Sequence, residues 1–400
     1  MKKINRREFL GTSAALACTA MLPAVVHAGE ALQSPSKSLP YLKDYQPGIS
    51  SAWTRKGTLE KSSGVIDAVL DAATDFSWLL KGDRVLIKLA LNSGNAFPAT
   101  SDPWVLEQVV RILKDKGVGE VLVGDQSGIQ AVQWNRDSQR GSSRELCRSA
   151  GLLQTIEASG ATPVFFEEAG YDAYVRTSPP GNHHWETPLW IPSILNQVDH
   201  IIFMPRVSSH VMGEITSGMK LGVGFLREDS RRVFHSGGKD FFAMYEEIAQ
   251  VPEISSRLRL VITSGRKVLT TIGPDFGDVA EPEHGLVFAT EDLLANEIFS
   301  YAWLVWNREF ETSYFAKVTK GNVSRFGSFI NKKFVGKYWP KDDAEVEGFN
   351  VFRAGHIYDH PAIMNFMQRK GGKPMGIDWN SINAVEDNSI SAYLKQQMMS

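Results

Sequence analysis

The chain of 400 residues is long enough for one large α/β domain with additions, and its hydrophobic content of 43% is ordinary for a globular protein. It has 43 basic and 45 acidic residues, a balance that argues against a nucleic-acid surface, which needs a concentrated basic face. Its only cysteines are Cys18 and Cys147, so an iron–sulfur cluster or zinc site held by four cysteines of this chain is excluded.

Residues 1–28 are typical of an export signal. A basic start precedes an apolar run, and Val26-His27-Ala28 supplies small or apolar residues for cleavage after position 28. The segment from Asn5 to Leu10 resembles the twin-arginine signal, which directs folded proteins to a dedicated export machine. We therefore expect a periplasmic protein with that machinery as a partner. An ordinary secretory signal, lipidation at Cys18 and an uncleaved anchor are the alternatives.

Cleavage changes the charge and the cysteine chemistry of the chain. Residues 1–28 hold four basic residues and one acidic residue, so 39 basic and 44 acidic residues remain, a net charge of −5. Cys147 is then the only cysteine, and no disulfide can form within one mature chain. Because proteins often use this route when they fold or load a cofactor before crossing, the signal is weak support for a cofactor.

The next segments predict a linker and then the first half of a domain. Residues 29–60 are rich in Ser and Pro and lack periodicity, which indicates a linker or an arm lying on the domain. The regular part spans 61–306. Its first expected elements are a helix at 65–73, a strand at 85–91, a helix with Asp102 as N-cap and Pro103 as its first residue, and a strand at 120–125. This strand–helix–strand unit implies parallel pairing.

The pattern continues with alternating helices and strands. Helices are expected at 143–158, 194–198, 241–248 and 292–306, and strands at 162–166, 200–204, 258–263 and 286–289. The whole predicts a doubly wound, mostly parallel α/β domain. Residues 307–400 are expected to form a loop-rich, aromatic C-terminal addition packed on the core, with a carbohydrate-binding platform as the less favoured use of the aromatics.

Candidate site residues follow the predicted strands. In open parallel sheets, ligands bind beyond the C-terminal ends of the strands. Such ends carry Lys88 and Asn92, then Gly124-Asp125, then the segment 205–210, with a fourth candidate loop at 273–277. The third end opens a glycine-rich, non-periodic stretch, residues 198–239, that contains His210, Lys220 and His235.

These residue types suit a binding or catalytic site. A neutral histidine is a good metal ligand and proton carrier near pH 7, and a lysine amine can form a covalent link or clamp an anion. Four arginines add positive charge suited to a carboxylate or phosphate: Arg206, Arg227, Arg231 and Arg232. Arg231-Arg232 is expected to be a solvated surface pair, and the alternative for His210 is a loop hydrogen bond.

The same positions resemble the bacterial family called domain of unknown function 362. That family carries a lysine and an asparagine after its first strand, Gly-Asp after its second, and later a Thr-x-x-x-Lys-like segment and a histidine. The matching residues here are Lys88, Asn92, Gly124-Asp125, Pro205 to His210, Thr216, Lys220, His235, Gly273-Pro274 and Asp292 to Asn296. The resemblance implies ligand-binding positions at Lys88, Asn92, Thr216 and Lys220. Ser208 and Asn296 depart from the family pattern, which has Lys and Asp there.

The stretch from His210 to Gly222, followed by His235, is more distantly similar to the nickel-pincer lactate racemase family. By that resemblance Lys220 would tether a pyridine-derived nickel cofactor, His235 would ligate the metal and His210 would move a proton. The family's second acid/base histidine has no counterpart after the second strand, where this chain has Asp125. Asp125 is therefore the candidate second base, with capping of a turn as the alternative.

Two pairs of histidines outside this stretch are assigned to loops. His356 and His360 could share one helical face, but Pro361 and neighbouring Gly355 favour a loop. His183 and His184 lie among prolines and glycine. The leading hypothesis is a metal- or cofactor-assisted enzyme that acts on a small carboxylate-bearing molecule. The alternatives are a non-catalytic periplasmic factor that binds an anion or metal, and a protein that retains the fold for a structural role.

Overall fold

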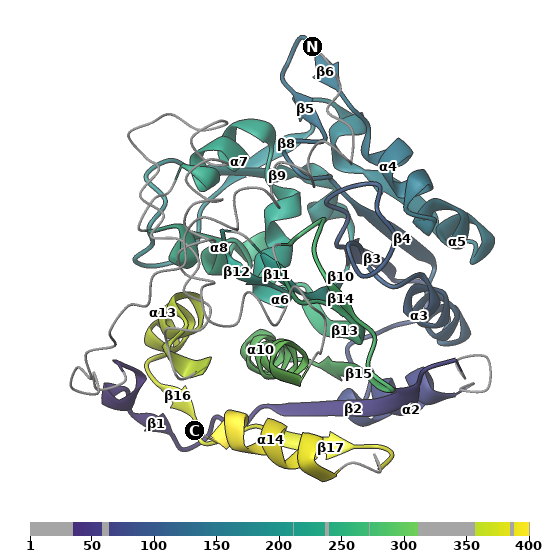
Figure 1. Ribbon diagram of the computed structural model, residues 1–400. Coiled ribbons are helices and arrows are strands. Elements are labelled where there is room, and N and C mark those ends of the chain that lie inside the picture. The colour runs from purple at the N-terminus through teal and green to yellow at the C-terminus, as the bar shows by residue number, and fades with distance from the viewer. Residues whose placement is uncertain are drawn as a thin grey trace, which may run out of the picture. The chain divides into compact units, whose positions relative to one another are not determined.

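The computed structural model describes residues 35–57, 64–210, 212–236, 240–271, 273–310, 357–384 and 388–399 (Figure 1). The expected export segment, residues 1–28, lies outside these ranges. Within them, no helix combines the length and the apolar character needed to cross a membrane.

A large, mostly parallel sheet organises the described residues. Its strands, in spatial order, are β17 (Asp378–Ser381), β2 (Gly48–Arg55), β15 (His284–Thr290), β13 (Leu258–Leu269), β10 (His200–Met204), β3 (Arg84–Leu89), β4 (Glu120–Asp125) and β7 (Thr162–Phe165). All neighbours from β13 to β7 are parallel, whereas β15 runs antiparallel to both β13 and β2. The predicted α/β class is confirmed.

The order of the strands shows where the chain reverses its direction of travel across the sheet. From β3 the chain moves outward to β4 and β7, and it then returns to β10 and β13 on the other side of β3. Because β3 and β10 are adjacent and their following connections leave in opposite directions, their C-terminal ends border a topological switch point. This is the place where doubly wound sheets bind ligands.

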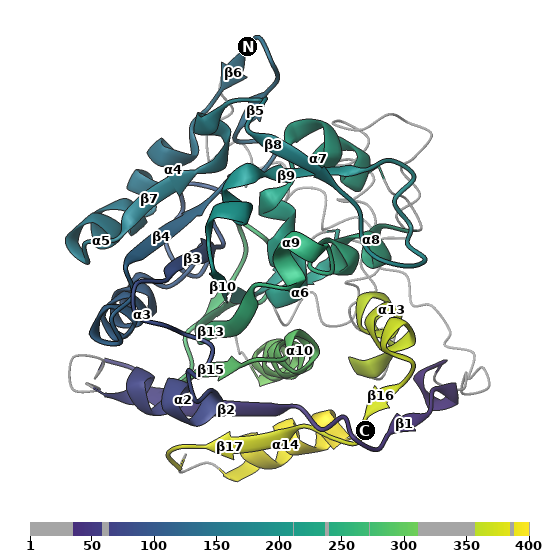
Figure 2. The same cartoon turned by 180° about the vertical axis from the view of Figure 1, so that it is seen from behind.

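Side chains of each central strand alternate between two hydrophobic cores. In β10, Ile202 and Met204 enter one core and Ile201 and Phe203 the other. The first core is covered by α2 (Val65–Ala73), α3 (Pro103–Asp115), α4 (Ser143–Ser149) and α5 (Leu152–Ala158). The second is covered by α8 (Phe241–Ile248), α10 (Leu293–Phe310), α13 (Pro361–Lys370) and α14 (Asn388–Met399). Figure 2 shows the two groups of helices from behind.

Short elements complete the described fold. They are η1 (Pro35–Ser38), β1 (Tyr41–Leu42), β5 (Gln133–Trp134), β6 (Gln139–Arg140), η3 (Phe166–Ala169), β8 (Tyr174–Thr177), β9 (Leu189–Pro192), η4 (Ser193–Gln197), β11 (Arg206–His210), β12 (Glu214–Thr216), α6 (Gly218–Leu221), η5 (Gly222–Phe225), α7 (Glu228–His235), α9 (Pro252–Ser255), β14 (Val279–Ala280), η8 (Ile357–Asp359) and β16 (Lys373–Pro374). Of these, β11, β12 and β14 extend the main sheet beside β13.

The segment expected to be a linker contains a strand of the main sheet. Strand β2 pairs along its length with β15, and Trp53 lies opposite Leu286. Its six central residues, three of them apolar and three with hydroxyl groups, are all buried. The hydroxyl side chains hide the apolar pattern that signals a strand, and this is why the prediction for 29–60 is wrong at Gly48–Arg55.

The predicted helix at 143–158 is two helices. The break is at Gly151, which has a φ of 81° and therefore ends one helix and begins the next. The expected N-cap of α3 is confirmed, because Asp102 accepts a hydrogen bond from the Trp104 N–H at 3.0 Å.

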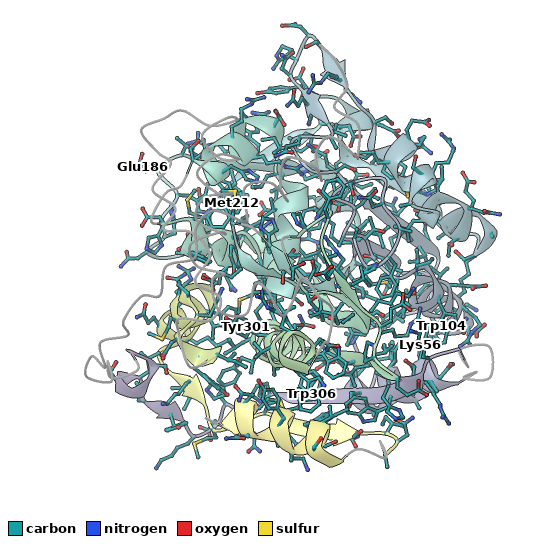
Figure 3. All side chains as sticks on the ribbon, viewed as in Figure 1. Lys56, Trp104, Glu186, Met212, Tyr301 and Trp306 are labelled. Carbon is teal, nitrogen blue, oxygen red and sulfur yellow. The ribbon has the colours of Figure 1, made fainter. Side chains whose placement is uncertain are left out.

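The described part of the C-terminal addition packs on the core, as expected. Strand β17 pairs in parallel with β2, and α14 lies against α10. Two ring contacts anchor the addition: the ring centroids of Tyr301 and His360 are 5.5 Å apart, and those of Trp306 and Tyr393 are 5.2 Å apart. Figure 3 labels Tyr301 and Trp306, both on α10. Residues 311–356, which hold most of the aromatics considered as a platform and His356, lie outside the described ranges. His360 lies between η8 and α13, at the N-cap of α13.

Candidate functional site

Lys88 and Asp125 form a buried ion pair at the ends of β3 and β4. Their Nζ and Oδ1 atoms are 2.6 Å apart, and neither side chain is more than 4% exposed. Lys88 also donates to the Leu89 carbonyl at 2.9 Å. Asp125 accepts backbone N–H groups of Leu91 at 2.8 Å and Gln126 at 2.7 Å. Both oxygens of Asp125 are therefore already engaged.

The backbone of Gly224 packs directly against this ion pair. A Cβ atom at position 224 would lie 2.0 Å from Asp125 Oδ1 and 2.4 Å from Lys88 Nζ, so only glycine fits. The Phe225 ring covers the same ammonium at 5.1 Å. The geometry favours the capping alternative for Asp125 over the role of second base, and it gives Lys88 a partner inside the protein rather than a ligand.

The stretch that follows β10 is a hairpin followed by three short helical segments. Strands β11 and β12 pair antiparallel, with His210 opposite Glu214 and Ser208 opposite Thr216. Helix α10 holds the stretch in place: Ser217 Oγ lies 2.7 Å from Ser300 Oγ. Although this stretch has no periodic apolar pattern, strand pairing within the hairpin and contacts to α10 give it a regular structure.

Glu297 on α10 is a further buried group that the sequence did not single out. It accepts the Met219 N–H at 2.9 Å through Oε2, and its Oε1 is buried without a hydrogen-bond partner. Burial raises the pKa of Glu297 to about 7. The carboxyl group supports the short helix that carries Lys220. The sequence pattern did not distinguish Glu297 as a buried residue, because α10 is apolar on most sides and has no clear polar face.

Lys220 lies among other cations. Its side chain is only partly exposed, and its ammonium lies 6.0 Å from the centre of the Phe234 ring. Burial, with the positive charges of Arg206 and Arg231, lowers the pKa of Lys220 to about 7. At neutral pH this amine is therefore much easier to deprotonate than an ordinary lysine.

His210 is held as one tautomer. Its Nδ1 accepts hydrogen bonds from the backbone N–H groups of Met212 at 3.0 Å and Gly213 at 3.1 Å. The neutral ring therefore carries its hydrogen on Nε2. Burial lowers the pKa of His210 well below its usual value, and the positive charge of Lys220 lowers it further. His210 is thus neutral at pH 7 and a hydrogen-bond donor at Nε2.

His235 has the opposite tautomer. Its Nδ1 lies 2.7 Å from the Arg231 carbonyl, which can only accept, so Nδ1 carries the hydrogen and Nε2 the lone pair. Burial and the charge of Lys220 lower the pKa of His235 to about 3. The neutral ring suits a metal or a proton at Nε2. The three predicted residues lie in one region: His210 accepts the Gly213 N–H, a Cβ atom at Gly213 would lie 3.2 Å from Lys220 Cδ, and the Phe234 ring is next to both Lys220 and His235.

Arg206 and Asp275 complete the same region. The Arg206 guanidinium is 1% exposed and donates to the Pro274 carbonyl at 3.0 Å, but its Nε has no partner among the described residues. Asp275, from the fourth candidate loop, hydrogen bonds Ser93, and burial raises its pKa while Arg206 lowers it. One Asp275 oxygen is also buried, and no described residue hydrogen bonds to it.

Three of the four arginines considered for anion binding have other partners, and Arg232 is one of them, paired with Glu228 at 2.6 Å. The Arg231 side chain is 2% exposed and donates to the carbonyls of Ser127, Gln126 and Val223. The expectation of a solvated surface pair is therefore wrong for Arg231, although Arg232 is exposed. Arg227 is buried between aromatic rings, 3.9 Å from Tyr171 and 4.0 Å from Trp190.

The remaining predicted residues contribute through the backbone or lie elsewhere. Asn92 accepts the Gly128 N–H at 3.0 Å through its carbonyl, and Thr216 is a nearly buried residue of β12. His184 Nδ1 lies 2.7 Å from a carboxylate oxygen of Glu247 on α8, and neither residue follows a strand end at the switch point.

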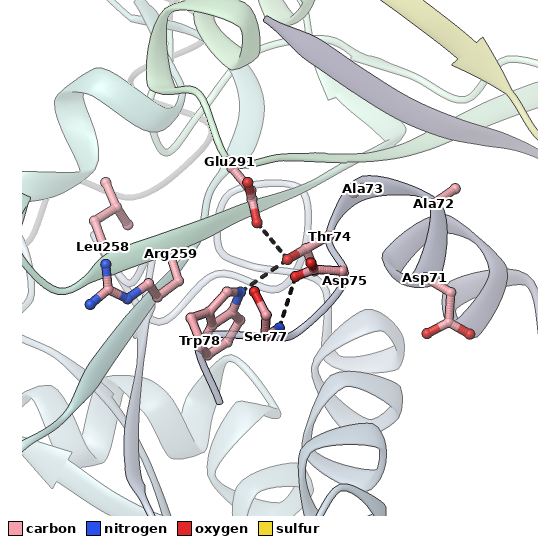
Figure 4. A pocket seen from close by; sticks show the side chains of 10 residues that line it. All are labelled: Asp71, Ala72, Ala73, Thr74, Asp75, Ser77, Trp78, Leu258, Arg259 and Glu291. Atoms are coloured by element: carbon pink, nitrogen blue, oxygen red, sulfur yellow. Dashed lines mark hydrogen bonds between the residues drawn. The ribbon is translucent and has the colours of Figure 1, made fainter. Parts of the chain in front are cut away.

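A hollow on the described surface lies at the other edge of the sheet. It has a volume of about 660 Å³ and is bordered by Thr74, Trp78 and Glu291 (Figure 4). Leu258, the first residue of β13, also lines it. Its polar groups bond each other, with Trp78 Nε1 donating to Thr74 Oγ1 at 2.9 Å. Because the hollow borders a strand start and offers few unpaired groups, it is a weaker site than the C-terminal edge.

The donor set limits which metal centres fit. Among the described residues, no group of three or more His, Cys, Asp or Glu side chains could hold a metal ion. A metal bound by these side chains alone does not fit.

The chain is similar to the lactate racemase apoprotein from Thermoanaerobacterium thermosaccharolyticum, with 13% identity and a TM-score of 0.39, over 63% of this chain and 58% of that one. The match thus spans less than two thirds of that protein. No curated protein matches the chain. The family described as "Domain of unknown function (DUF362)" matches residues 85–302, more than half of the 400 residues, and the chain therefore belongs to this family.

Proposed function

We propose that the C-terminal edge of β3, β10 and β13 is the site of an enzyme that binds a small carboxylate-bearing molecule and moves a proton next to that carboxylate. The observation that carries the proposal is the Arg206 guanidinium, fully buried with an unpaired Nε beside Lys220 and two histidines. Asp275 is the nearby carboxylate that balances these cations. A bound anion would supply the missing acceptor and negative charge.

The two histidine tautomers support a division of labour at this site. His210 offers an N–H at Nε2, which suits a hydrogen bond to a substrate oxygen, and His235 offers a lone pair at Nε2, which suits a proton or a metal. A bound carboxylate would raise the pKa of both rings, because opposite charge favours the protonated form. The substrate would thus bring His235 closer to the range of a useful base.

A tethered cofactor is compatible with the proposal. Lys220 would attach it and His235 would ligate its metal, in line with the sequence resemblance. Such a group would supply a Lewis acid beside the bound carboxylate. The protein residues would bind the anion through Arg206, donate through His210 and exclude water by burial.

The alternative is a non-catalytic anion-binding factor at the same place. It is favoured by Asp125, whose two oxygens are engaged by Lys88 and two backbone N–H groups, so that Asp125 is not available as the second base. A binding protein would gain thermal stability from its ligand without changing it.

We also propose that the chain is exported by the twin-arginine machinery and works in the periplasm. The support is the paired arginine motif before an apolar run in residues 1–28. Replacing Arg6 and Arg7 together by lysine should leave the chain in the cytoplasm of its host, as judged by fractionation. Unchanged periplasmic recovery would contradict the proposal.

Proton exchange separates an enzyme from a binding protein. The exported chain is incubated in D₂O with lactate, malate or alanine, and loss of the proton signal next to the carboxylate is followed by NMR. We expect exchange with at least one acid, and loss of exchange in His235→Gln. Stabilisation by an acid without exchange would favour the binding factor. Neither binding nor exchange with any of them would reject the carboxylate site.

A further inference from the structure

His360, at the N-cap of α13, is a buried histidine to which the proposed function gives no role. Its ring centroid lies 5.3 Å from that of Phe242 on α8 and 5.5 Å from that of Tyr301 on α10. Figure 1 shows α13 beside α8. Neither ring nitrogen makes a well-formed hydrogen bond to a described residue. A phenylalanine would fill this place without burying two polar atoms, so the histidine calls for an explanation beyond packing.

The polar edge of the His360 ring meets the turn that joins β11 and β12. His360 Nε2 lies 3.8 Å from a carboxylate oxygen of Glu214. Burial lowers the pKa of His360 to about 3, against a polar contact with the Gly213 backbone that raises it. The ring is therefore neutral at pH 7, and it can offer one N–H group to this turn.

The turn holds Glu214 in a conformation that residues other than glycine rarely adopt. Its φ is 63°, and the Ile215 N–H donates to the Gly213 carbonyl at 2.6 Å, which is the pattern of a γ-turn. Such a strained turn persists only where its surroundings hold it. The Glu214 side chain is buried. Burial raises the pKa of Tyr301, and the negative charge of Glu214 raises it further, so Glu214 lies near the ring that packs on His360.

The same turn determines the state of His210. Gly213 donates its N–H to His210 Nδ1 at 3.1 Å, while its carbonyl closes the turn around Glu214. Met212 donates to the same nitrogen at 3.0 Å. A rotation of the backbone at Gly213 would release His210 Nδ1, and the ring could then carry its hydrogen on either nitrogen.

We propose that His360 is a positioning residue for His210: its ring holds the strained turn at Gly213 and Glu214, and this turn keeps His210 in the tautomer with the hydrogen on Nε2. The C-terminal addition thus completes the site. This inference rests on the proposed function, in which His210 donates from Nε2 to a substrate oxygen. The tautomer can be measured without any substrate, so the two proposals can fail separately.

Nitrogen NMR of the full chain with isotope-labelled histidine tests the inference, because protonated and unprotonated ring nitrogens give separate signals. The spectrum of His210→Gln identifies the signals of His210. We expect the unsubstituted chain to show one His210 tautomer, with the hydrogen on Nε2. His360→Phe keeps an aromatic ring in place but turns C–H groups toward the hairpin. We expect it to give a mixture of His210 tautomers and to slow proton exchange of the accepted acid about tenfold or more.

A second variant and a matched control complete the test. Glu214→Gly adopts a φ of 63° without strain but lacks the buried carboxylate that anchors the turn, so it should also give a mixture of His210 tautomers. Tyr358→Phe removes one polar group from the same addition, where the Tyr358 hydroxyl donates to the Met398 carbonyl at 2.7 Å. This control should lower the Tm but leave the His210 tautomer and the exchange rate unchanged.

The outcomes separate this inference from the proposed function. A single His210 tautomer in His360→Phe would overturn the inference, even with slower exchange, because His360 would then act by another route. A mixture of tautomers in the unsubstituted chain or in Tyr358→Phe would overturn it as well. Absence of exchange with every acid, together with a His210 tautomer that depends on His360, would reject the proposed enzyme while supporting the positioning of His210.

Discussion

Replacing Lys88 by methionine should destabilise the chain by about 3 kcal/mol. Methionine keeps the apolar stem but removes the ammonium that lies 2.6 Å from Asp125 Oδ1, in a place without solvent contact. Removing one partner of a buried pair typically costs about 3–5 kcal/mol, because the other charge stays buried. The lower end is expected here, since the Leu91 and Gln126 N–H groups still donate to Asp125.

The double variant Lys88→Met/Asp125→Asn isolates the interaction. It removes both charges and keeps one side-chain oxygen for a backbone N–H group. We expect it to be more stable than the sum of the two single variants implies, by about 1.5 kcal/mol or more. Urea unfolding followed by fluorescence gives all four free energies of unfolding. A cost below about 1 kcal/mol for Lys88→Met, or strict additivity in the cycle, would refute the buried ion pair.

The remaining predictions concern other buried contacts. Gly224→Ala should destabilise the chain by about 2 kcal/mol or more, seen as a lower urea midpoint, because its Cβ would overlap Asp125 and Lys88; a neutral effect would contradict the closed pair. Because the pKa of Glu297 is about 7 in the folded chain and near 4.5 when unfolded, its favourable contribution is complete below pH 4.5 and is lost as the pH rises through 7. Glu297→Gln, which does not titrate, should therefore gain up to about 3 kcal/mol relative to the unsubstituted chain between pH 4.5 and pH 8, and parallel stability profiles would argue against a raised pKa.

The sequence predicts the fold correctly where neighbouring residues alone show which segment is buried or where a helix begins. Strands β3, β4 and β10 are apolar runs, and Asp102-Pro103 marks a helix start by its own chemistry. Strand β2 was not predicted, because its Ser and Thr residues are buried by pairing with β15, which lies more than 200 residues later in the sequence. Pairing over such a distance leaves no local signal.

The site could be located from the sequence, but the state of its residues could not. His210, Lys220 and His235 lie together as the pattern indicated, because all three follow one strand end. Arg231 looked like a surface residue, since its partners are carbonyls about 100 residues earlier in the chain. The tautomers of the two histidines depend on backbone groups that only the folded hairpin and helix α7 bring into place.

Binding of a small carboxylate to the cationic edge tests the central claim most directly. Calorimetric titration with lactate and malate compares the unsubstituted chain with Arg206→Met and Lys220→Met. Lys267→Met is the matched control, because this exposed lysine is paired with Glu281 at the surface. Loss of a charged hydrogen bond should weaken binding about tenfold or more in the first two variants and leave the control unchanged. Equal affinity in all four proteins would contradict the account.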